Sequence, residues 1–279
     1  MKLYDPGTLK TFLTQHGITA SKGLGQHFLC SRSAVESIVG ATEGCSGILE
    51  IGPGPGVLTS PLSESSESMI ALELDDRMIA ALKDSAPKAE VLKLDALQAD
   101  LPKLLSGLPE PRAIVSNLPY YITGPLVTRI AEARDHYSLA VLMMQKEVAH
   151  RIMAKAGNRN RGSLSVYLQS LFEISLVCHV APSAFVPPPK VESTVLKFIP
   201  KELNVPIELQ GKYFHLVRCS FAQPRKTLAN NLVAAYRVDR ETISSRIESV
   251  NLDEMIRPHD VPQEAWKLLA VAMADLILQ

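Results

Sequence analysis

A glycine-rich turn after an apolar run is the first feature of the sequence with chemical meaning. The segment ILEIGPGPGVLT at 48–59 carries Gly52, Gly54 and Gly56, which let the backbone turn sharply and let a ligand approach its amides. The spacing G-x-G-x-G differs from the G-x-G-x-x-G of dinucleotide sites, and Glu50 would repel a pyrophosphate. The turn favours a nucleoside ligand with a cationic or zwitterionic tail, and glycines that serve packing alone are the alternative.

Two more carboxylates lie at the ends of the next predicted strands. Glu73 lies 21 residues after Gly52, near the offset at which an acidic side chain accepts hydrogen bonds from ribose hydroxyls. Asp95 ends a third strand, where it could accept from the exocyclic amine of an adenine, although helix capping explains an isolated aspartate equally well. Three carboxylates at the ends of three successive strands are better explained by one pocket, and the ligand that fits it is S-adenosylmethionine.

The most diagnostic tetrapeptide is Asn117-Leu118-Pro119-Tyr120, within SNLPYYI. An amino group on an aromatic ring is a poor nucleophile because its lone pair is delocalised. If the Asn117 amide oxygen and the Leu118 carbonyl accept its two hydrogens, the nitrogen is drawn towards tetrahedral geometry. Pro119 fixes the turn, and Tyr120 offers a face on which a base stacks for roughly 1–3 kcal/mol. The tetrapeptide predicts methyl transfer to the amino group of a base without a strong general base.

These residues need strands that end at one edge of a sheet. Helical segments such as 57–66 and 76–85 separate apolar runs of strand length, and this alternation predicts an α/β fold with a parallel, Rossmann-like sheet covered by helices on both faces. Such sheets bind ligands at the carboxyl ends of their strands. The predicted strands are 47–51, 68–74, 89–94, 112–116 and 139–144.

Two later apolar runs and a helical tail complete the predicted architecture. The runs at 174–180 and 193–199 are joined by a proline-rich segment without a helix, so we expect an antiparallel hairpin that closes the first domain. After Pro200 the apolar residues take helical spacing. We predict a catalytic, cofactor-binding domain over 1–200 and a small all-helical domain over 201–279 that contributes to RNA binding.

Three further residues are interpreted as structural. His179 lies within a predicted strand and is expected to be a hydrogen-bonded structural residue rather than a ligand. The single tryptophan, Trp266, lies on an apolar helical stripe and is expected in the core. Asp239 has the position of a helix-start residue.

The composition fits a folded cytoplasmic protein. The 279 residues are 46% hydrophobic and 21% charged, enough apolar material for a core and too little charge for disorder. The longest strongly apolar run, at 139–144, is too short for a membrane helix, and the N-terminus lacks a signal-peptide core. The four cysteines form no CxxC pair, and no residue cluster has metal-site spacing. We therefore expect no membrane, no metal, a reducing cytoplasm and a monomer.

The net charge is zero, but charges of each sign are grouped. Residues 46–145 carry 8 lysines and arginines against 13 acidic residues, whereas 146–161 carry 5 against 1 and 212–246 carry 7 against 2. Short basic stretches are often only solvated faces. Contact with RNA phosphates is therefore open on charge alone.

Several further motifs join the glycine turn, the tetrapeptide and the strand-end carboxylates. They are KGLGQHFL at 22–29, QKEVAHRI at 145–152, GSLSV at 162–166, AFVPPPKVES at 184–193 and RKTLANNL at 225–232. Together these motifs resemble the ribosomal RNA adenine N6-dimethyltransferases of the KsgA/RsmA type, from about residue 20 to about residue 235. The resemblance implies dimethylation of two adjacent adenosines in a loop near the 3′ end of 16S ribosomal RNA in the small ribosomal subunit, with S-adenosylmethionine as cofactor and a role in ribosome biogenesis.

The resemblance also assigns roles to individual residues. It assigns to the cofactor pocket His27, Leu29, Gly52, Glu73, Asp95 and Asn117, beside Glu50, Gly54 and Gly56 of the same turn. It assigns to the target amine Asn117, Leu118 and Tyr120, and to the second face of the base Phe185. With RNA as the partner, the residues expected to clamp phosphates include Arg159, Arg161, Arg225 and Lys226.

The sequence departs from the family pattern at three positions. The family usually has asparagine where His27 stands, so an imidazole replaces a carboxamide at the cofactor. Pro224 stands where the family commonly has an arginine, and Arg161 stands where it often has an aromatic residue. None of these positions belongs to the tetrapeptide chemistry, so we expect an active enzyme with altered RNA or cofactor affinity at most.

Two other interpretations stay open. Methyltransferases that act on large-subunit ribosomal RNA share the strand-end motifs, although the helical tail and the GLGQHFL start favour the small subunit. The second is a ribosome-assembly factor whose binding outweighs its chemistry. DNA adenine methyltransferases are disfavoured, since they usually carry a second proline where this chain has Leu118 and flip a base out of a duplex.

Overall fold

A computed structural model of the chain describes residues 2–19, 26–203 and 205–277. The chain divides into two compact units, one of residues 1–149 with 173–200 and one of residues 150–172 with 201–279. The segment 150–172, which the sequence analysis placed in the first domain, groups with the C-terminal helices. Residues 22–25 of the predicted KGLGQHFL motif lie outside the described residues.

A seven-stranded sheet with the order β4-β3-β2-β5-β6-β9-β7 forms the centre of the first unit. Strands β2 to β6 pair in parallel, and β9 joins β6 antiparallel. The predicted α/β class with a mostly parallel sheet is therefore confirmed. The strands are β2 (Gly47–Ile51), β3 (Ser68–Glu73), β4 (Glu90–Lys93), β5 (Arg112–Asn117), β6 (Leu139–Gln145), β7 (Phe172–Val180) and β9 (Ser193–Pro200).

The strand order places a crevice where the sequence analysis expects the ligand. From β2 the chain builds outward to β3 and β4 on one side and to β5 and β6 on the other. Ligands of open α/β sheets bind outside the carboxyl ends of the strands at such a reversal of order. The ends of β2 and β5, at Ile51 and Asn117, are neighbours at that point.

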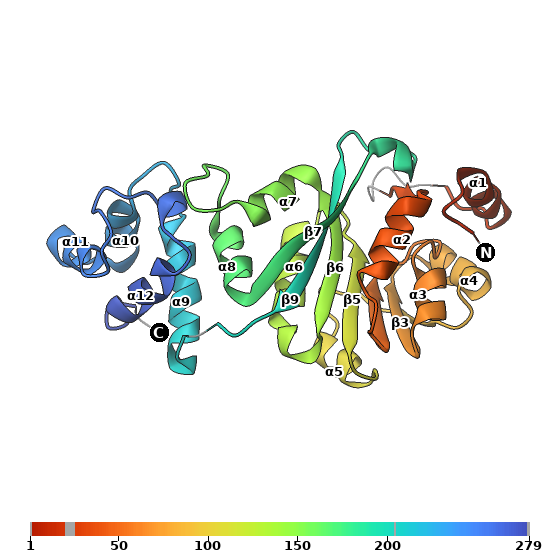
Figure 1. Cartoon of the computed structure of the whole chain (residues 1–279), viewed down its shortest axis with the longest axis horizontal. Helices are drawn as coiled ribbons and strands as arrows, with labels where there is room; N and C mark the ends of the chain where they lie inside the picture. The colour runs from red at the N-terminus through yellow and green to blue at the C-terminus, as the bar shows by residue number, and fades with distance from the viewer. Residues whose placement is uncertain (1, 20–25, 204, 278–279) are drawn as a thin grey trace. The chain divides into compact units, whose positions relative to one another are not determined.

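Helices pack against this sheet in the first unit (Figure 1). Their bounds are α1 (Pro6–Gln15), α2 (Arg32–Gly40), α3 (Thr59–Ser65), α4 (Asp76–Ser85), α5 (Leu101–Ser106), α6 (Thr123–Glu132) and the 3₁₀ turn η2 (Arg134–His136), while α7 (Lys146–Met153) runs on into the second unit. Side chains begin several of them, as at Asp75, whose carboxylate accepts from the Arg77 amide at 3.0 Å. The central strands β2, β5 and β6 are almost entirely buried apolar runs because both of their faces are covered, whereas the outer strands β4 and β7 are exposed or half-buried at most positions.

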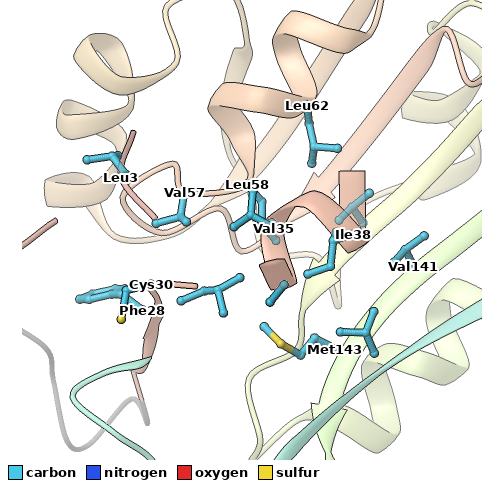
Figure 2. Packing of buried hydrophobic residues seen from close by; sticks show 14 of the residues in the cluster. Leu3, Phe28, Cys30, Val35, Ile38, Val57, Leu58, Leu62, Val141 and Met143 are labelled. Atoms are coloured by element: carbon cyan, nitrogen blue, oxygen red, sulfur yellow. The ribbon is translucent and has the colours of Figure 1, made fainter. Parts of the chain in front are cut away.

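One face of the sheet packs into a large apolar cluster. Val35 and Ile38 of α2, Leu62 of α3, and Val141 and Met143 of β6 belong to this cluster (Figure 2), and all five are at most 2% exposed. The two β6 residues are two positions apart, so they share a face of the strand. Since burying one such side chain contributes roughly 1.5–3 kcal/mol, this cluster fixes the helices that flank the crevice.

The proline-rich segment before β9 does more than connect two strands. It forms the 3₁₀ turn η3 (Pro182–Ala184) and the short strand β8 (Phe185–Val186), which pairs antiparallel with β1 (Phe28–Leu29). The prediction of a simple hairpin connection was therefore incomplete, although β9 and β7 are neighbours in the sheet as expected. In β7, the exposed His179 pairs through Nδ1 with the Thr194 hydroxyl at 3.1 Å, so it is hydrogen-bonded as expected.

The second unit is helical, as predicted for the C-terminal residues. It contains α8 (Ser163–Leu171), α9 (Ile207–Ser220), α10 (Leu228–Tyr236), α11 (Arg240–Glu248), the 3₁₀ turn η4 (Pro258–Asp260) and α12 (Ala265–Ala272). Trp266 is fully buried, which confirms it as a core residue. The Asp239 carboxylate accepts from the Thr242 amide at 2.8 Å and starts α11, as expected. Within the described ranges, no helix has the length and apolar character needed to span a membrane.

Candidate active site

A cavity of about 350 Å³ lies at the carboxyl ends of β2, β3, β4 and β5. It lies entirely within the first unit, since every lining residue falls between 26 and 126. The predicted site residues that line it are His27, Leu29, Glu50, Gly52, Gly54, Glu73, Asp95, Asn117, Leu118, Pro119 and Tyr120. The sheet thus brings together three strand-end carboxylates and the tetrapeptide.

The three glycines of the turn have different roles. Gly52 has φ of +71°, and a Cβ built there would meet nothing within 4 Å. Because Gly52 lines the cavity, no side chain covers its backbone on the cavity side. Gly56, at φ of +95°, does not line the cavity, and its Cβ would lie 2.3 Å from Ser85 Oγ of α4. The assignment of Gly56 to cofactor binding is therefore corrected, because it permits close packing between the turn and α4. Gly52 and Gly54 are the glycines at the cavity.

Glu73 is held by three backbone amides at the end of β3. Its Oε2 accepts from Gly54 at 3.1 Å, and its Oε1 accepts from Leu74 at 2.7 Å and from Asp75 at 3.0 Å. A carboxylate has about four lone-pair sites, so one acceptor position stays available after these bonds. This arrangement fixes the carboxylate and leaves it able to accept a hydrogen bond from a ligand hydroxyl.

Glu50 is buried beside the glycine turn. It is 1% exposed, and its Oε2 has no hydrogen-bond partner among the described residues. Burial, with a smaller contribution from the charge of Glu73, raises the pKa of Glu50 to about 8. A buried unpartnered carboxyl oxygen at a cavity wall fits a cationic group in the ligand, because such a group would favour the ionised form.

Asp95 forms a capping contact and also lies at the cavity. Its Oδ1 accepts from the Leu97 amide at 2.9 Å, which is the capping contact. It also lines the cavity, and the remaining oxygen, Oδ2, has only a long 3.4 Å contact with Gln98. Capping and ligand contact are therefore compatible at this position.

The tetrapeptide follows directly from the end of β5. The Leu118 amide donates to the Met143 carbonyl of β6 at 2.9 Å, and the Leu118 side chain is 1% exposed. The Pro119 carbonyl accepts from the Ile122 amide at 3.2 Å and closes the turn. Among the hydrogen bonds of the described residues, none involves the Asn117 side chain or the Leu118 carbonyl. Two acceptors at the cavity are thus available to an amino group.

Two rings stand at this end of the cavity. The centroids of His27 and Tyr120 are 6.0 Å apart, with 28° between the ring planes. The Nδ1 of His27 lies 2.8 Å from the Pro187 carbonyl, and because a carbonyl oxygen only accepts, Nδ1 carries the hydrogen. The Tyr120 hydroxyl pairs with the Ser193 hydroxyl at 2.9 Å. The imidazole thus has Nε2 left for other contacts.

Phe185 does not lie where the resemblance placed it. It is 2% exposed, pairs with Leu29 across the β1–β8 ladder, and belongs to the apolar cluster instead of the cavity wall. The assignment of Phe185 to the second face of the base is therefore corrected for this structure. Burial of a phenyl ring is worth a few kcal/mol, which holds it in the core.

Arg161 is also corrected, since it is 3% exposed and cannot lie on a phosphate. Its guanidinium donates to the Val261 carbonyl at 2.5 Å and to Gln263 Oε1 at 2.6 Å, all within the second unit. Arg159, Arg225 and Lys226 are exposed in that unit, as a phosphate contact requires.

The sequence analysis missed the apolar rim of the cavity. Leu74 is 57% exposed, Leu94 is 41% exposed and Tyr121 is 66% exposed, and all three line the cavity. Large apolar side chains that follow or precede strand-end carboxylates are the signal that could have found the two leucines. Exposed apolar groups of this kind suit the faces of an aromatic ligand.

Comparison with known proteins identifies the family. Residues 17–266 match the family Ribosomal RNA adenine dimethylase. The chain belongs to the ribosomal RNA adenine dimethylase family. This confirms the resemblance inferred from the motifs.

Relatives of this dimethylase extend over nearly the whole chain. A protein of Nostoc sp. named ribosomal RNA small subunit methyltransferase A is 38% identical over 263 residues, covering 89% of this chain and 96% of the relative. A protein of the same name from Geobacillus thermodenitrificans is 34% identical and covers 97% of each chain. The match is therefore to complete relatives and not to one shared domain.

Solved structures agree with the dimethylase fold. A dimethyladenosine transferase from Plasmodium falciparum superposes with a TM-score of 0.75 at 26% identity, covering 90% of this chain and 98% of that chain. The 23S rRNA methyltransferase ErmE gives a TM-score of 0.69 at 25% identity, covering 88% and 99%. Both results confirm the methyltransferase fold class.

Proposed function

We propose that this dimethylase transfers methyl groups from S-adenosylmethionine to N6 of two adjacent adenosines near the 3′ end of 16S ribosomal RNA, giving dimethyladenosine at each. The observation that carries the proposal is the cavity at which Glu50, Glu73 and Asp95 meet Asn117 and Leu118. The names of the Nostoc and Geobacillus relatives support the small subunit as the site of action.

The cavity fits this cofactor in three respects. Glu73 retains an acceptor for ribose hydroxyls, Gly52 leaves its backbone open to the ligand, and Glu50 offers a buried unpartnered oxygen to a cationic group. Asp95 would accept from the adenine amine, between the apolar side chains of Leu74 and Leu94 at the rim. Bound S-adenosylmethionine supplies the activated methyl group.

The tetrapeptide prepares the nucleophile. The Asn117 amide oxygen and the Leu118 carbonyl accept the two N6 hydrogens of the target adenosine, which draws the nitrogen out of conjugation and makes its lone pair available. The Leu118 carbonyl is held in place because the amide of the same residue is bonded to Met143 of β6. Tyr120 stacks on the base and keeps it in this position.

The remaining parts of the proposal concern RNA and the cell. We infer that the first unit carries catalysis and that exposed cations of the second unit, among them Arg159, Arg225 and Lys226, bind RNA phosphates. A small-subunit substrate places the protein in the cytoplasm, where the free cysteines of the described chain stay reduced. We propose that it acts as a monomer.

Methyl transfer to ribosomal subunits tests the proposal. Small subunits that lack the modification are incubated with radiolabelled S-adenosylmethionine, and the labelled nucleoside is identified after digestion. We expect dimethyladenosine in 16S RNA with the wild type and a loss of at least 100-fold with Asn117→Ala, because one of the two amine acceptors is gone. An unchanged urea-unfolding midpoint shows that the variant is folded, and this check does not depend on Asn117, which itself lines the cofactor cavity.

Other outcomes separate the alternatives. Label on large-subunit RNA alone would assign the chain to the activity that ErmE is named for. Absence of label on both subunits, with intact cofactor and small-subunit binding, would favour an assembly factor. In that case the inactive protein should impair subunit assembly more than absence of the protein does.

A further inference from the structure

The segment from Phe185 to Ser193 touches the active site at two points, although its phenylalanine is buried in the core. Its Pro187 carbonyl accepts from Nδ1 of His27, and its Ser193 hydroxyl pairs with the hydroxyl of Tyr120. His27 and Tyr120 in turn face each other as stacked rings. One short segment therefore reaches the ring of Tyr120 by two separate routes.

Ser193 is well placed to hold a ring still. It is 0% exposed, and it is fixed in the sheet at the first position of β9, opposite Gln145 of β6. Tyr120 lies in a turn 73 residues away in sequence, at the cavity wall. A hydroxyl anchored in a strand thus restrains the far end of a side chain that begins in a turn.

His27 restrains the same ring through its face. The ring of His27 cannot rotate without losing the 2.8 Å bond from Nδ1 to the Pro187 carbonyl. His27 directly precedes β1, whose residues Phe28 and Leu29 pair with Val186 and Phe185 of the same segment. The imidazole is therefore tied to the same segment as Ser193.

We propose that Ser193 is a positioning residue that presets the ring of Tyr120 for the target base, with His27 and the Pro187 carbonyl as the second support. This inference rests on the proposed function, because Tyr120 acts as a platform only if the target is a base. A ring already held in place loses less conformational freedom when the base arrives, which favours stacking. Ser193 pairs with Tyr120 and not with the amine acceptors Asn117 and Leu118, so its effect should pass through Tyr120 alone.

A double-mutant cycle tests whether Ser193 acts through Tyr120. Ser193→Ala and Tyr120→Phe each remove one partner of the hydroxyl pair, and each should lower kcat/KM for the RNA by about 3- to 10-fold. Ser193→Ala added to Tyr120→Phe should cost less than a further twofold, with the dissociation constant of S-adenosylmethionine unchanged. If Ser193→Ala costs as much beside Tyr120→Phe as it does alone, the inference is wrong.

The matched control is Thr194→Val. Thr194 is the next residue of β9, is also buried, and has a hydroxyl that pairs with His179 instead of Tyr120. This variant should leave kcat/KM within twofold of the wild type. Should Ser193→Ala fail to fold, Ser193→Cys keeps the size of the side chain and takes its place in the cycle. An equal loss of kcat/KM in Thr194→Val would overturn the role given to Ser193.

A measurement without RNA keeps the inference separate from the proposed function. The protein with its seven tyrosines replaced by 3-fluorotyrosine is studied by ¹⁹F NMR, and the Tyr120 signal is the one missing from Tyr120→Phe. Ser193→Ala should shift or broaden this signal, whereas Thr194→Val should leave it in place. An unmoved signal in Ser193→Ala overturns the positioning role, while a wild type without methyl transfer to small subunits overturns only the proposed function.

Discussion

Two carboxylates that line the same cavity are held in opposite environments. Glu73 accepts three backbone amides, whereas Glu50 is buried with one oxygen unpartnered among the described residues. Burial disfavours the ionised form of Glu50 and outweighs the opposing effect of the Thr59 hydroxyl on its pKa. Residues of one chemical type therefore serve different purposes, Glu73 as a fixed acceptor and Glu50 as a group whose charge depends on what enters the cavity.

Glu50 makes the stability of the ligand-free protein depend on pH. Its pKa is raised from 4.5 to about 8 in the folded state, so its stabilising contribution is complete below pH 4.5 and is lost as the pH rises through about 8. Between about pH 5 and about pH 9, we expect the free energy of unfolding of the wild type to fall by on the order of a few kcal/mol relative to that of Glu50→Gln. Urea unfolding of both proteins at these pH values measures the difference. Parallel pH profiles would contradict the prediction.

Gly52 should be required for the cofactor and not only for the turn. Gly52→Ala places a methyl group in the open space at the cavity and strains a backbone at φ of +71°. Gly44→Ala is the control, since Gly44 has φ of +86°, is exposed and does not line the cavity. Each change should cost about 1–2 kcal/mol of stability, but only Gly52→Ala should weaken S-adenosylmethionine binding by at least tenfold. Calorimetric titration measures the affinity of each variant for S-adenosylmethionine. Equal affinities in the two variants would contradict a role for Gly52 in cofactor binding.

At the scale of elements, the buried side chain of Arg161 holds the loop between α7 and α8 in place through hydrogen bonds. Arg161 bonds to the Val261 carbonyl and to Gln263, and the Gly157 amide donates to the His259 carbonyl at 3.0 Å. Burial lowers the pKa of Arg161, and its guanidinium forms no ion pair with a described carboxylate. A backbone carbonyl and a side-chain amide therefore accept from the two terminal nitrogens of Arg161, whereas its Nε is buried without a partner among the described residues. The loop that Arg161 holds also carries the exposed Arg159.

Arg161→Met should destabilise the second unit. The change leaves the buried Val261 carbonyl and the half-buried Gln263 side-chain oxygen without their donor, which we expect to cost about 2–4 kcal/mol. Arg159→Met removes the same charge two residues away at an exposed position, so its cost should stay below about 0.5 kcal/mol. Urea unfolding of both variants provides the comparison. Equal stability of the two would mean that the buried hydrogen bonds of Arg161 contribute nothing.

At the scale of the whole molecule, zero net charge conceals two units of opposite sign. The first unit contains 15 lysines and arginines against 19 acidic residues, and the second contains 14 against 10. Within the second unit, the segment 150–172 contains four of these cations and no acidic residue. The distribution therefore matches the division of roles that we propose, with a neutral to acidic catalytic unit and a basic unit for phosphates.

The loop between α7 and α8 carries exposed cations, and we expect it to set part of the salt dependence of RNA binding. Lys155→Ala with Arg159→Ala removes two exposed cations, so the slope of log K against log salt should fall by about 1–2, since each phosphate contact contributes roughly 0.7–0.9. Lys83→Ala with Lys88→Ala removes the same charge from exposed positions of the first unit and should leave the slope unchanged. Binding titrations at several salt concentrations measure both. The same change of slope in both double variants would mean that the net charge of the protein, and not contacts of Lys155 and Arg159 with phosphates, sets the salt dependence.

The sequence by itself determined the features that depend on short stretches of chain. The strands predicted at 47–51, 68–74 and 112–116 from apolar runs agree with β2, β3 and β5 to within one residue. The open turn at Gly52 and the position of Asn117 and Leu118 at the cavity follow from local residue types. Because parallel strands end at one edge, their order along the chain was enough to place the carboxylates together.

Only the tertiary structure decided the contacts between distant residues. Phe185 is buried in the core. The Arg161 side chain donates to a residue 100 positions away in the sequence. Position 56 requires glycine because a Cβ there would collide with Ser85 of α4. The pairing of Ser193 with Tyr120 across 73 residues has no local signal either. Burial and pairing of this kind depend on which elements pack together, and single-chain patterns of spacing carry no information about that.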